Sequence, residues 1–357
     1  MKKLMIIKNF SMNKNILFAF LAAFLFGTST PLAKVIIGSN HFLVIAGLLY
    51  LGSGLGLSIV RLLRDKGWKP ANMSKNDYLW FGGAIFFGGI LGPNLLLFGL
   101  ISTNASTASL LLNLEVVLTA CLAWFVFKEN FDTRIFLGML FIVLSAILLS
   151  IPQDNNFSFS FLGPILISLS CLCWAIDNNL TRKISGSDAL FIASVKGLVS
   201  GITNCSLAII ISVKFPSILM TISTMIIGLF GYGISIVLFI LALRGLGAAR
   251  TGAYFASAPF IGAIISIYFL SENISEYFWF ASFLMLIGVW LHLTENHDHE
   301  HKHELMKHDH THTHDEHHQH EHDFIWDGTE PHNHSHIHKE ITHKHKHFPD
   351  IHHTHKH

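Results

Sequence analysis

The chain has 357 residues, of which 51% are hydrophobic and only 13% are charged, and its mean hydropathy is +0.48. Soluble globular proteins carry about 25% charged residues. The composition therefore argues against a large soluble protein and favours a membrane protein. The net charge of +1 is unevenly distributed, because residues 1–296 carry +7 while residues 297–357 carry −6 and hold 23 of the 25 histidines.

Apolar runs of the length that crosses a bilayer, about 20 residues, follow a short N-terminal arm, residues 1–14. We predict ten such runs, near residues 15–37, 42–63, 78–101, 105–127, 134–151, 161–181, 189–213, 217–243, 248–270 and 276–293. The expected fold is an all-α polytopic membrane protein. Its two five-helix halves cover residues 15–151 and 152–293, and a disordered histidine-rich tail covers residues 294–357.

The positive charges support this count. Cytoplasmic loops of membrane proteins are enriched in Lys and Arg. With the N-terminus in the cytoplasm, 15 of the 18 Lys and Arg of residues 1–296 fall in the arm or in alternate loops on that side. The sequence therefore predicts a multi-pass protein of the inner membrane with both termini in the cytoplasm.

Two segments of the body resemble each other at an offset of 143 residues. Residues 105–130 and 248–273 each begin with small residues, continue as an apolar run and end in Glu-Asn. Each is the fourth run of a five-run half, and five is odd, so the second copy is expected to lie upside down relative to the first. This is the inverted-repeat layout of secondary transporters, whose substrate sites lie near the bilayer midplane between the repeats.

These two segments, the ten runs and the opening Phe24-Leu-Phe-Gly-Thr-Ser-Thr-Pro-Leu-Ala-Lys34 resemble the EamA family of the drug/metabolite transporter superfamily. The resemblance covers roughly residues 15–293. It implies a bundle of five plus five helices that moves small solutes by alternating access, commonly as an exporter. The tail resembles those of a subset of such transporters with histidine-rich cytoplasmic ends.

Ionisable groups inside a membrane are costly and mark functional sites or buried partners. Glu115 is either a substrate or proton site or a structural partner for Lys34 or Lys196. Lys196 is suited to bind an anionic group or to hold Glu115, and Lys34 either contributes to the site or extends to the interface. Asp177, near the inner mouth, belongs to the pathway or to a helix-end network. The remaining candidates for substrate binding are Asn94, Asn113 and Tyr254.

Histidines alternate with polar and acidic residues along the tail. Neutral imidazole is a preferred ligand of Ni, Zn, Co and Cu ions, and a flexible chain can gather several without a fold. We therefore predict binding of a divalent transition metal, which weakens below about pH 6.5 as imidazole protonates. An acid-sensitive polyelectrolyte or a purification tag are the alternatives. The expected ligands are His297, His299, His301, His303, His308, His310, His312, His314, His332, His334, His336, His338, His343, His345, His347, His353, His355 and His357.

The sequence favours a secondary transporter that exports small solutes, with a tail that collects, senses or buffers metal. A Ni, Co or Zn efflux transporter is the first alternative, although the body holds only His41 and His292, and a membrane metal sensor without transport is the second. The sequence lacks GxxxxGK[ST], HExxH and GxSxG motifs, which disfavours an ATP-driven pump and an enzyme. The expected partners are the lipid bilayer and a small-molecule or metal-ion substrate, with no nucleic acid, no required cofactor and no catalytic residue. The oligomeric state is not readable from the sequence.

Overall fold

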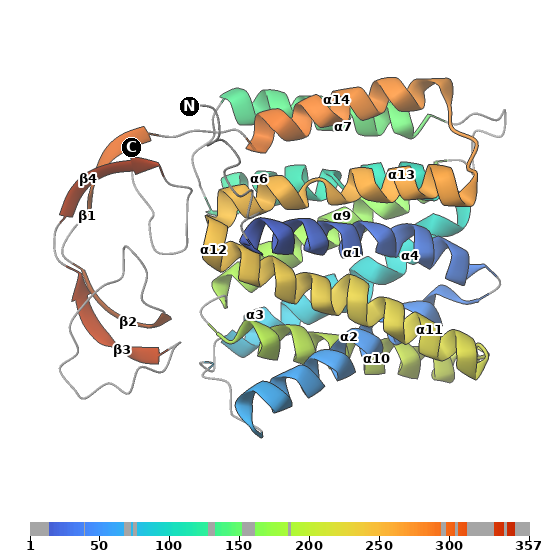
Figure 1. The fold of residues 1–357 in the computed structure, drawn as a ribbon, viewed down its shortest axis with the longest axis horizontal. Helices are drawn as coiled ribbons and strands as arrows, with labels where there is room; N and C mark the ends of the chain where they lie inside the picture. Colours follow the sequence, from blue (N-terminus) through green and yellow to red (C-terminus); the bar gives the residue numbers. More distant parts are fainter. Residues whose placement is uncertain are drawn as a thin grey trace, which may run out of the picture.

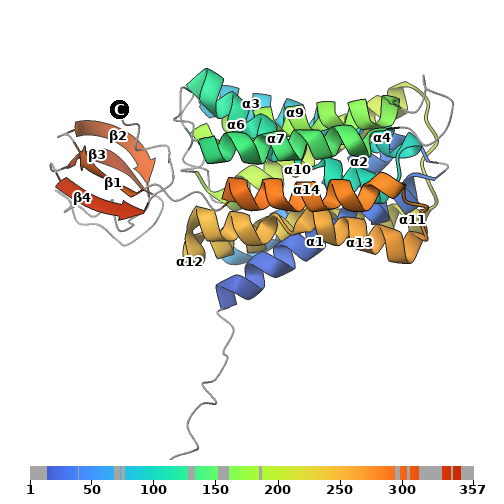
Figure 2. The same ribbon diagram turned by 90° about the horizontal axis from the view of Figure 1, so that it is seen from above.

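The computed structural model describes residues 14–38, 40–67, 73, 77–127, 133–151, 161–184, 187–293, 298–303, 306–312, 332–338 and 341–346. Residues 14–293 form a bundle of roughly aligned helices (Figure 1), and Figure 2 shows the same arrangement from above. The N-terminus of α1 and the C-terminus of α14 lie at the same end of the bundle (Figure 1).

The first half contains α1 (Lys14–Ile37), α2 (Phe42–Asp65), α3 (Asp77–Ala84), the π-helix η1 (Ile85–Leu91), α4 (Gly92–Ser102), α5 (Ala105–Leu111), α6 (Leu114–Phe127) and α7 (Thr133–Leu149). The second half contains α9 (Leu162–Lys183), α10 (Ala189–Ile210), α11 (Ile218–Gly228), the π-helix η2 (Leu229–Ile234), α12 (Ser235–Phe255), α13 (Ala258–Leu270) and α14 (Glu276–Leu293). Their apolar sequences and sparse Pro account for the long helices.

The offset of 143 residues relates irregularities of the two halves as well as their helices. The π-helices η1 and η2 occupy equivalent places between α3 and α4 and between α11 and α12. The helix breaks at residues 112–113 and 256–257 also correspond, to within one residue of this offset. Shared irregular features are stronger support for a repeat than shared apolar character, because any two membrane helices are apolar.

The two halves exchange their first helices. Helix α1 packs against α12 and α13 of the second half, while α9 packs against α4 and α6 of the first. Equivalent helices also meet directly, as α2 with α10 and α7 with α14. Where α2 crosses α10, Gly54 and Gly197 face each other, and a Cβ on Gly197 would lie 2.7 Å from the Gly54 Cα. Only glycine permits this approach, and these two residues are themselves 143 apart.

The core lies between the helices and contains fully buried side chains such as Leu49, Leu97, Leu111, Ile142 and Met285. The outer surface is also apolar, and Ile218 and Phe269 are 80% and 81% exposed. Within the described residues, seven helical segments are long and apolar enough to cross a membrane, and the helices covering Thr133–Leu149 and Glu276–His292 are shorter and apolar. The chain is therefore a multi-pass membrane protein, and the number of ten spans stays a prediction.

One predicted boundary falls inside an assigned helix. The sequence places a break at residues 244–247, and α12 is assigned continuously from Ser235 to Phe255, yet the rings of Phe239 and Phe255 lie 4.8 Å apart. Sixteen residues of straight helix would separate them by about 24 Å, so the chain reverses direction between these two residues, in the interval that contains the predicted break. Residues 244–250 contain Gly and Ala but no Pro, Asn or Asp to stop a helix. A separate break at residues 256–257 comes just before Pro259, a residue suited to the first turn of α13.

The tail contains four strands, β1 (Asp298–His303), β2 (Met306–His312), β3 (His332–His338) and β4 (Ile341–Lys346). They pair as two antiparallel two-stranded sheets, β1 with β4 and β2 with β3. The prediction of a tail without regular structure therefore differs from the structure in these segments. The reason is the alternation of His with other residues, because a period of two is the period of a strand.

Candidate functional site

Glu115 lies at the start of α6, directly after the break at residues 112–113. Its carboxylate Oε1 accepts a hydrogen bond of 2.7 Å from Nδ2 of Asn178 on α9. Glu115 is half-buried and Asn178 is exposed, so this contact between the halves is accessible. The sequence suggested Lys34 or Lys196 as a structural partner of Glu115, but the side chain that donates to the Glu115 carboxylate is that of Asn178.

Lys196 of α10 pairs with Asp177, the neighbour of Asn178 on α9. The Nζ of Lys196 donates to Oδ2 of Asp177, and Oγ1 of Thr181 donates to Oδ1 at 3.0 Å. Both charges act on Glu115. We call Glu115, Asn178, Asp177 and Lys196 the polar cluster. It joins three residues proposed from the sequence, Glu115, Asp177 and Lys196, with one that the sequence did not single out.

The π-helix η1 supplies the surface against which the polar cluster rests. The Gly88 carbonyl accepts hydrogen bonds from the Tyr50 hydroxyl at 2.8 Å and from the Trp174 indole at 3.1 Å. A Cβ at Gly88 would lie 1.9 Å from Oδ2 of Asp177. Glycine at position 88 therefore makes room for the Asp177 carboxylate. The sequence gives only one signal for this role, the Gly88-Gly89 pair in an apolar run.

Asparagines join the halves beside the polar cluster. Nδ2 of Asn94 on α4 donates to Oδ1 of Asn204 on α10 at 2.8 Å, and Nδ2 of Asn204 lies 3.3 Å from the Gly89 carbonyl. Asn113 is buried at the helix break and donates to the carbonyl of Leu110 at 3.2 Å. Asn94 is thus an interhelical link, while Asn113 stabilises the break that precedes Glu115.

Two other proposed site residues make contacts elsewhere. The Nζ of Lys34 donates to the carbonyls of Leu100 and Thr103 at the end of α4, the latter at 2.9 Å. Carbonyls at a helix C-terminus favour a cation, so Lys34 stabilises the end of α4. The ring of Tyr254 packs against Phe20, with centroids 4.9 Å apart.

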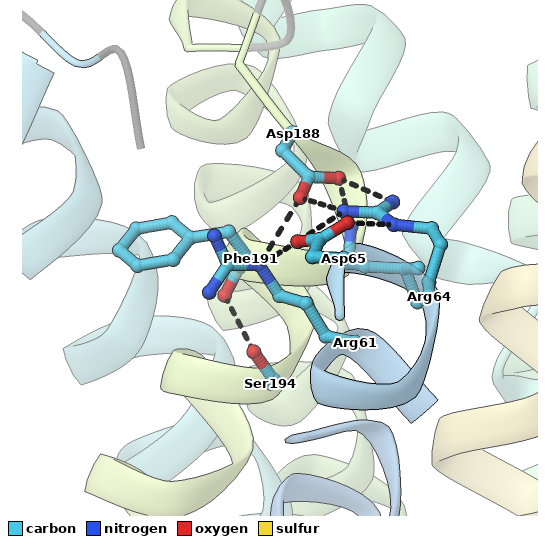
Figure 3. A network of polar contacts seen from close by, with 7 residues as sticks. Arg61, Arg64, Asp65, Asp188, Phe191 and Ser194 are labelled. Atoms are coloured by element: carbon cyan, nitrogen blue, oxygen red, sulfur yellow. Dashed lines mark hydrogen bonds and ion pairs between the residues drawn. The ribbon is translucent and has the colours of Figure 1, made fainter. Parts of the chain in front are cut away.

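A second charged network joins α2 to the beginning of α10 (Figure 3). Asp188 lies 2.6 Å from Nη2 of Arg64 and 3.2 Å from Nε of the buried Arg61, and its side chain caps α10 by accepting from the Leu190 N–H at 3.1 Å. Burial acts to raise the pKa of the Asp188 carboxyl, but the hydrogen bonds and charge of Arg64, with Arg61, outweigh burial and hold that pKa below its usual range. This network fastens the two halves together at one end of the bundle.

Replacing Asp188 by Asn is expected to lower the free energy of unfolding at pH 7 by about 2–3 kcal/mol, since it removes hydrogen bonds to charged groups and leaves Arg61 less well paired. Because the folded pKa is lowered, this stabilisation is present above about pH 3.9 and is lost as the pH falls further. Unfolding in detergent measures the change. D65N should cost less, because Asp188 also caps α10 and lies closer to the buried Arg61, at 3.2 Å against 3.7 Å for Asp65; equal losses would contradict the assignment.

Glu272 makes a third contact between the halves. Its two carboxylate oxygens accept from the backbone N–H groups of Ala105 at 2.6 Å and Ser106 at 2.8 Å, at the N-terminus of α5. Nδ2 of Asn104 donates to the carbonyl of Asn273 at 2.9 Å. The Glu-Asn ending of the second repeat therefore caps the beginning of the first. The corresponding Glu129 lies outside the described residues.

Replacing Glu272 by Gln is expected to destabilise the protein by about 1 kcal/mol, because the charge that favours the α5 N-terminus and one of the two acceptors are lost. Chemical unfolding in detergent measures this difference. The exposed Glu276, which begins α14, provides the matched control E276Q. A loss no larger in E272Q than in E276Q would rule out the capping role.

The predicted metal ligands lie partly inside the strands. His299, His301, His303, His308, His310, His312, His332, His334, His336, His338, His343 and His345 occupy β1 to β4. His297, His314, His347, His353, His355 and His357 lie outside the described residues. Among side chains that the structure describes, no group of three or more His, Cys, Asp or Glu is placed to hold a metal ion.

An all-helical membrane bundle of two related halves, with polar contacts across their interface, is the architecture of a membrane transporter. Residues 13–151 and 161–294 each match the EamA-like transporter family, and the chain belongs to that family.

Two relatives are themselves named only as transporters. An uncharacterized transporter of Methanothermobacter thermautotrophicus is 28% identical over 285 residues, covering 76% of this chain and 83% of that protein. The uncharacterized transporter YyaM of Bacillus subtilis is 26% identical over 230 residues, covering 60% of this chain and 73% of YyaM. A protein crystal structure with a TM-score of 0.58 and 17% identity covers 79% of this chain and 96% of its own, which supports the fold alone.

Proposed function

We propose that the protein is a secondary transporter that exports small organic solutes by alternating access, with Glu115 as the substrate-binding or proton-coupled carboxylate. The observation that carries this proposal is the Glu115–Asn178 hydrogen bond between the halves. Because the two residues belong to different repeats, a relative movement of the halves changes this contact. A carboxylate whose partner changes with conformation can exchange that partner for a proton or a solute.

The chemistry of the polar cluster favours an organic solute over a metal ion as cargo. Beside Glu115 the structure provides the Asn178 amide and the Asp177–Lys196 ion pair, and the Tyr50 phenol and the Trp174 indole bind the carbonyl of Gly88, which lies against Asp177. These groups suit a solute that carries hydrogen-bonding groups and an apolar part, whereas Ni, Co and Zn ions favour imidazole and thiolate. The solute that fits best is small and polar, with a cationic or donor group for Glu115.

The test is transport by the full chain in proteoliposomes, with a panel of amino acids and with Ni, Co and Zn ions, beside E115Q and a chain truncated after Leu293. Organic flux that survives truncation and falls in E115Q supports the proposal. Flux restricted to metal ions and lost on truncation supports metal efflux instead. No flux in wild type or truncated protein would favour the sensor.

For the tail we propose binding of a divalent transition metal, Ni, Zn, Co or Cu, in the cytoplasm. The metal binding is inferred from the 23 histidines of residues 297–357. The location is inferred from the Lys and Arg of residues 1–296, whose distribution among the loops favours cytoplasmic termini in an inner membrane. Reporter fusions at residue 357 test the location. A reporter active only outside the cell would overturn the orientation.

A further inference from the structure

The strand pairing of the tail places histidines opposite histidines. In the sheet of β2 and β3 the opposed residues are His308 and His336, His310 and His334, and His312 and His332. In the sheet of β1 and β4 they are His299 and His345, and His301 and His343. Five histidines of β1 and β2 are thus register partners of five histidines of β4 and β3, although the paired residues are 20 to 46 positions apart in the chain.

The alternate positions of β1 and β4 favour the same register independently. Asp298 is opposite Lys346, and Glu300 is opposite Lys344. Opposite charges directly across an antiparallel pair stabilise it, and like charges destabilise it. Because successive residues of a strand belong to opposite faces, this sheet has two charge pairs at one set of positions and two histidine pairs at the other, and its remaining partners are Lys302 with Thr342 and His303 with Ile341. A slip by one residue would remove both sets of pairs.

The spacing of these positions suits metal binding. Residues directly opposed in an antiparallel pair have Cβ atoms about 4.5–5.5 Å apart, and two imidazoles rooted at that separation can share an ion with bonds of about 2.0–2.1 Å. The next His pair along the strands is two residues away, about 6.8 Å. Each pair is therefore one potential site, and water or a neighbouring tail residue can complete its coordination.

We propose that the two sheets of the tail form a ladder of metal sites, each built on one opposed His pair, three on β2–β3 and two on β1–β4. This proposal rests on the proposed metal binding of the tail and adds its ligand pairs and stoichiometry. The ligand class is a borderline divalent cation such as Ni²⁺ or Zn²⁺, for which neutral imidazole is a preferred donor. Binding of the first ion fastens the two strands together and so favours the next pair.

The test compares two triple variants of the full chain in detergent, titrated with Ni²⁺ by calorimetry at pH 7.5. H308Q/H310Q/H312Q removes one member of every pair on β2–β3. H317Q/H318Q/H320Q removes the same number of histidines from positions outside the four strands. The number of tightly bound ions is expected to fall from about five to about two in the first variant, which loses three of the five pairs, and to stay near five in the second.

Equal losses in the two variants would show that only the number of histidines matters, which overturns the paired sites while leaving metal binding by the tail intact. A wild-type chain that binds no Ni²⁺ or Zn²⁺ would overturn both proposals. A second measurement uses Cu²⁺, since ions in adjacent pairs about 7 Å apart should broaden each other's electron paramagnetic resonance signal. That broadening should disappear in H301Q/H343Q/H310Q/H334Q, which removes one of the two pairs of β1–β4 and the middle pair of β2–β3, and its persistence there would contradict the ladder.

Discussion

Transport by E115Q is expected to be reduced by roughly 10- to 100-fold, which corresponds to the loss of about 1.5–3 kcal/mol from a hydrogen bond to a charged group. Gln has nearly the size of Glu and keeps an oxygen that can accept from Asn178. The substitution therefore removes the charge and the proton site while the contact of 2.7 Å between α6 and α9 can remain. The unfolding temperature should accordingly change little, so that reduced transport reports on function.

The measurement is transport, in proteoliposomes, of the solute that the panel identifies. A pH-sensitive dye inside the vesicles follows proton movement at the same time. Loss of proton movement with retained solute exchange identifies Glu115 as a proton site, and loss of both identifies a substrate site. The matched control is E276Q, which removes an exposed carboxylate at the start of α14 and should transport as wild type. Wild-type flux in E115Q would remove Glu115 from the mechanism.

The sequence predicts this carboxylate for a physical reason. A charge in an apolar run is costly, so Glu115, Asp177 and Lys196 stand out without any structure. Their partners do not stand out, because the pairing depends on how α9 lies between α6 and α10. Lys196 was expected to reach Glu115 or an anionic ligand, yet it meets Asp177, nineteen residues earlier.

The residues that sequence reasoning missed share another cause. In the sequence, Tyr50 and Trp174 resemble ordinary residues of apolar spans. Both donate hydrogen bonds to the carbonyl of Gly88, which lies in a π-helix that no residue pattern predicts. The fold was easier to predict where apolar runs have sharp ends. The expected run 276–293 coincides with α14, Glu276–Leu293. The breaks at residues 112–113 and 256–257 fall inside apolar runs and were not foreseen.

The histidine tail shows how composition and pattern can point to different structures. Its composition has too few apolar residues for a core, which predicts disorder. Its alternation has the period of a strand, and β1 to β4 follow that period. The register also places Asp298 opposite Lys346, and opposite charges at such positions favour pairing, which a count of apolar residues does not consider.

Removing either charge of the Asp177–Lys196 pair should destabilise the protein by about 3–5 kcal/mol, whereas removing both should cost much less. Asp177 is buried and the Lys196 side chain is only 19% exposed, so K196M or D177N leaves an uncompensated charge in the bundle. The double variant D177N/K196M has no such charge and should recover most of the stability. Thermal unfolding of the four proteins in detergent gives the coupling energy.

The same four proteins separate a structural role of this pair from a role in transport. If Lys196 and Asp177 only hold α9 against α10, the double variant transports the solute as wild type once its stability is recovered. If either charge acts on the solute or on Glu115, on which both act electrostatically, the double variant stays folded but its flux falls and its pH dependence shifts. A double variant whose loss of stability equals the sum of the two single losses would contradict the ion pair itself, because independent losses add.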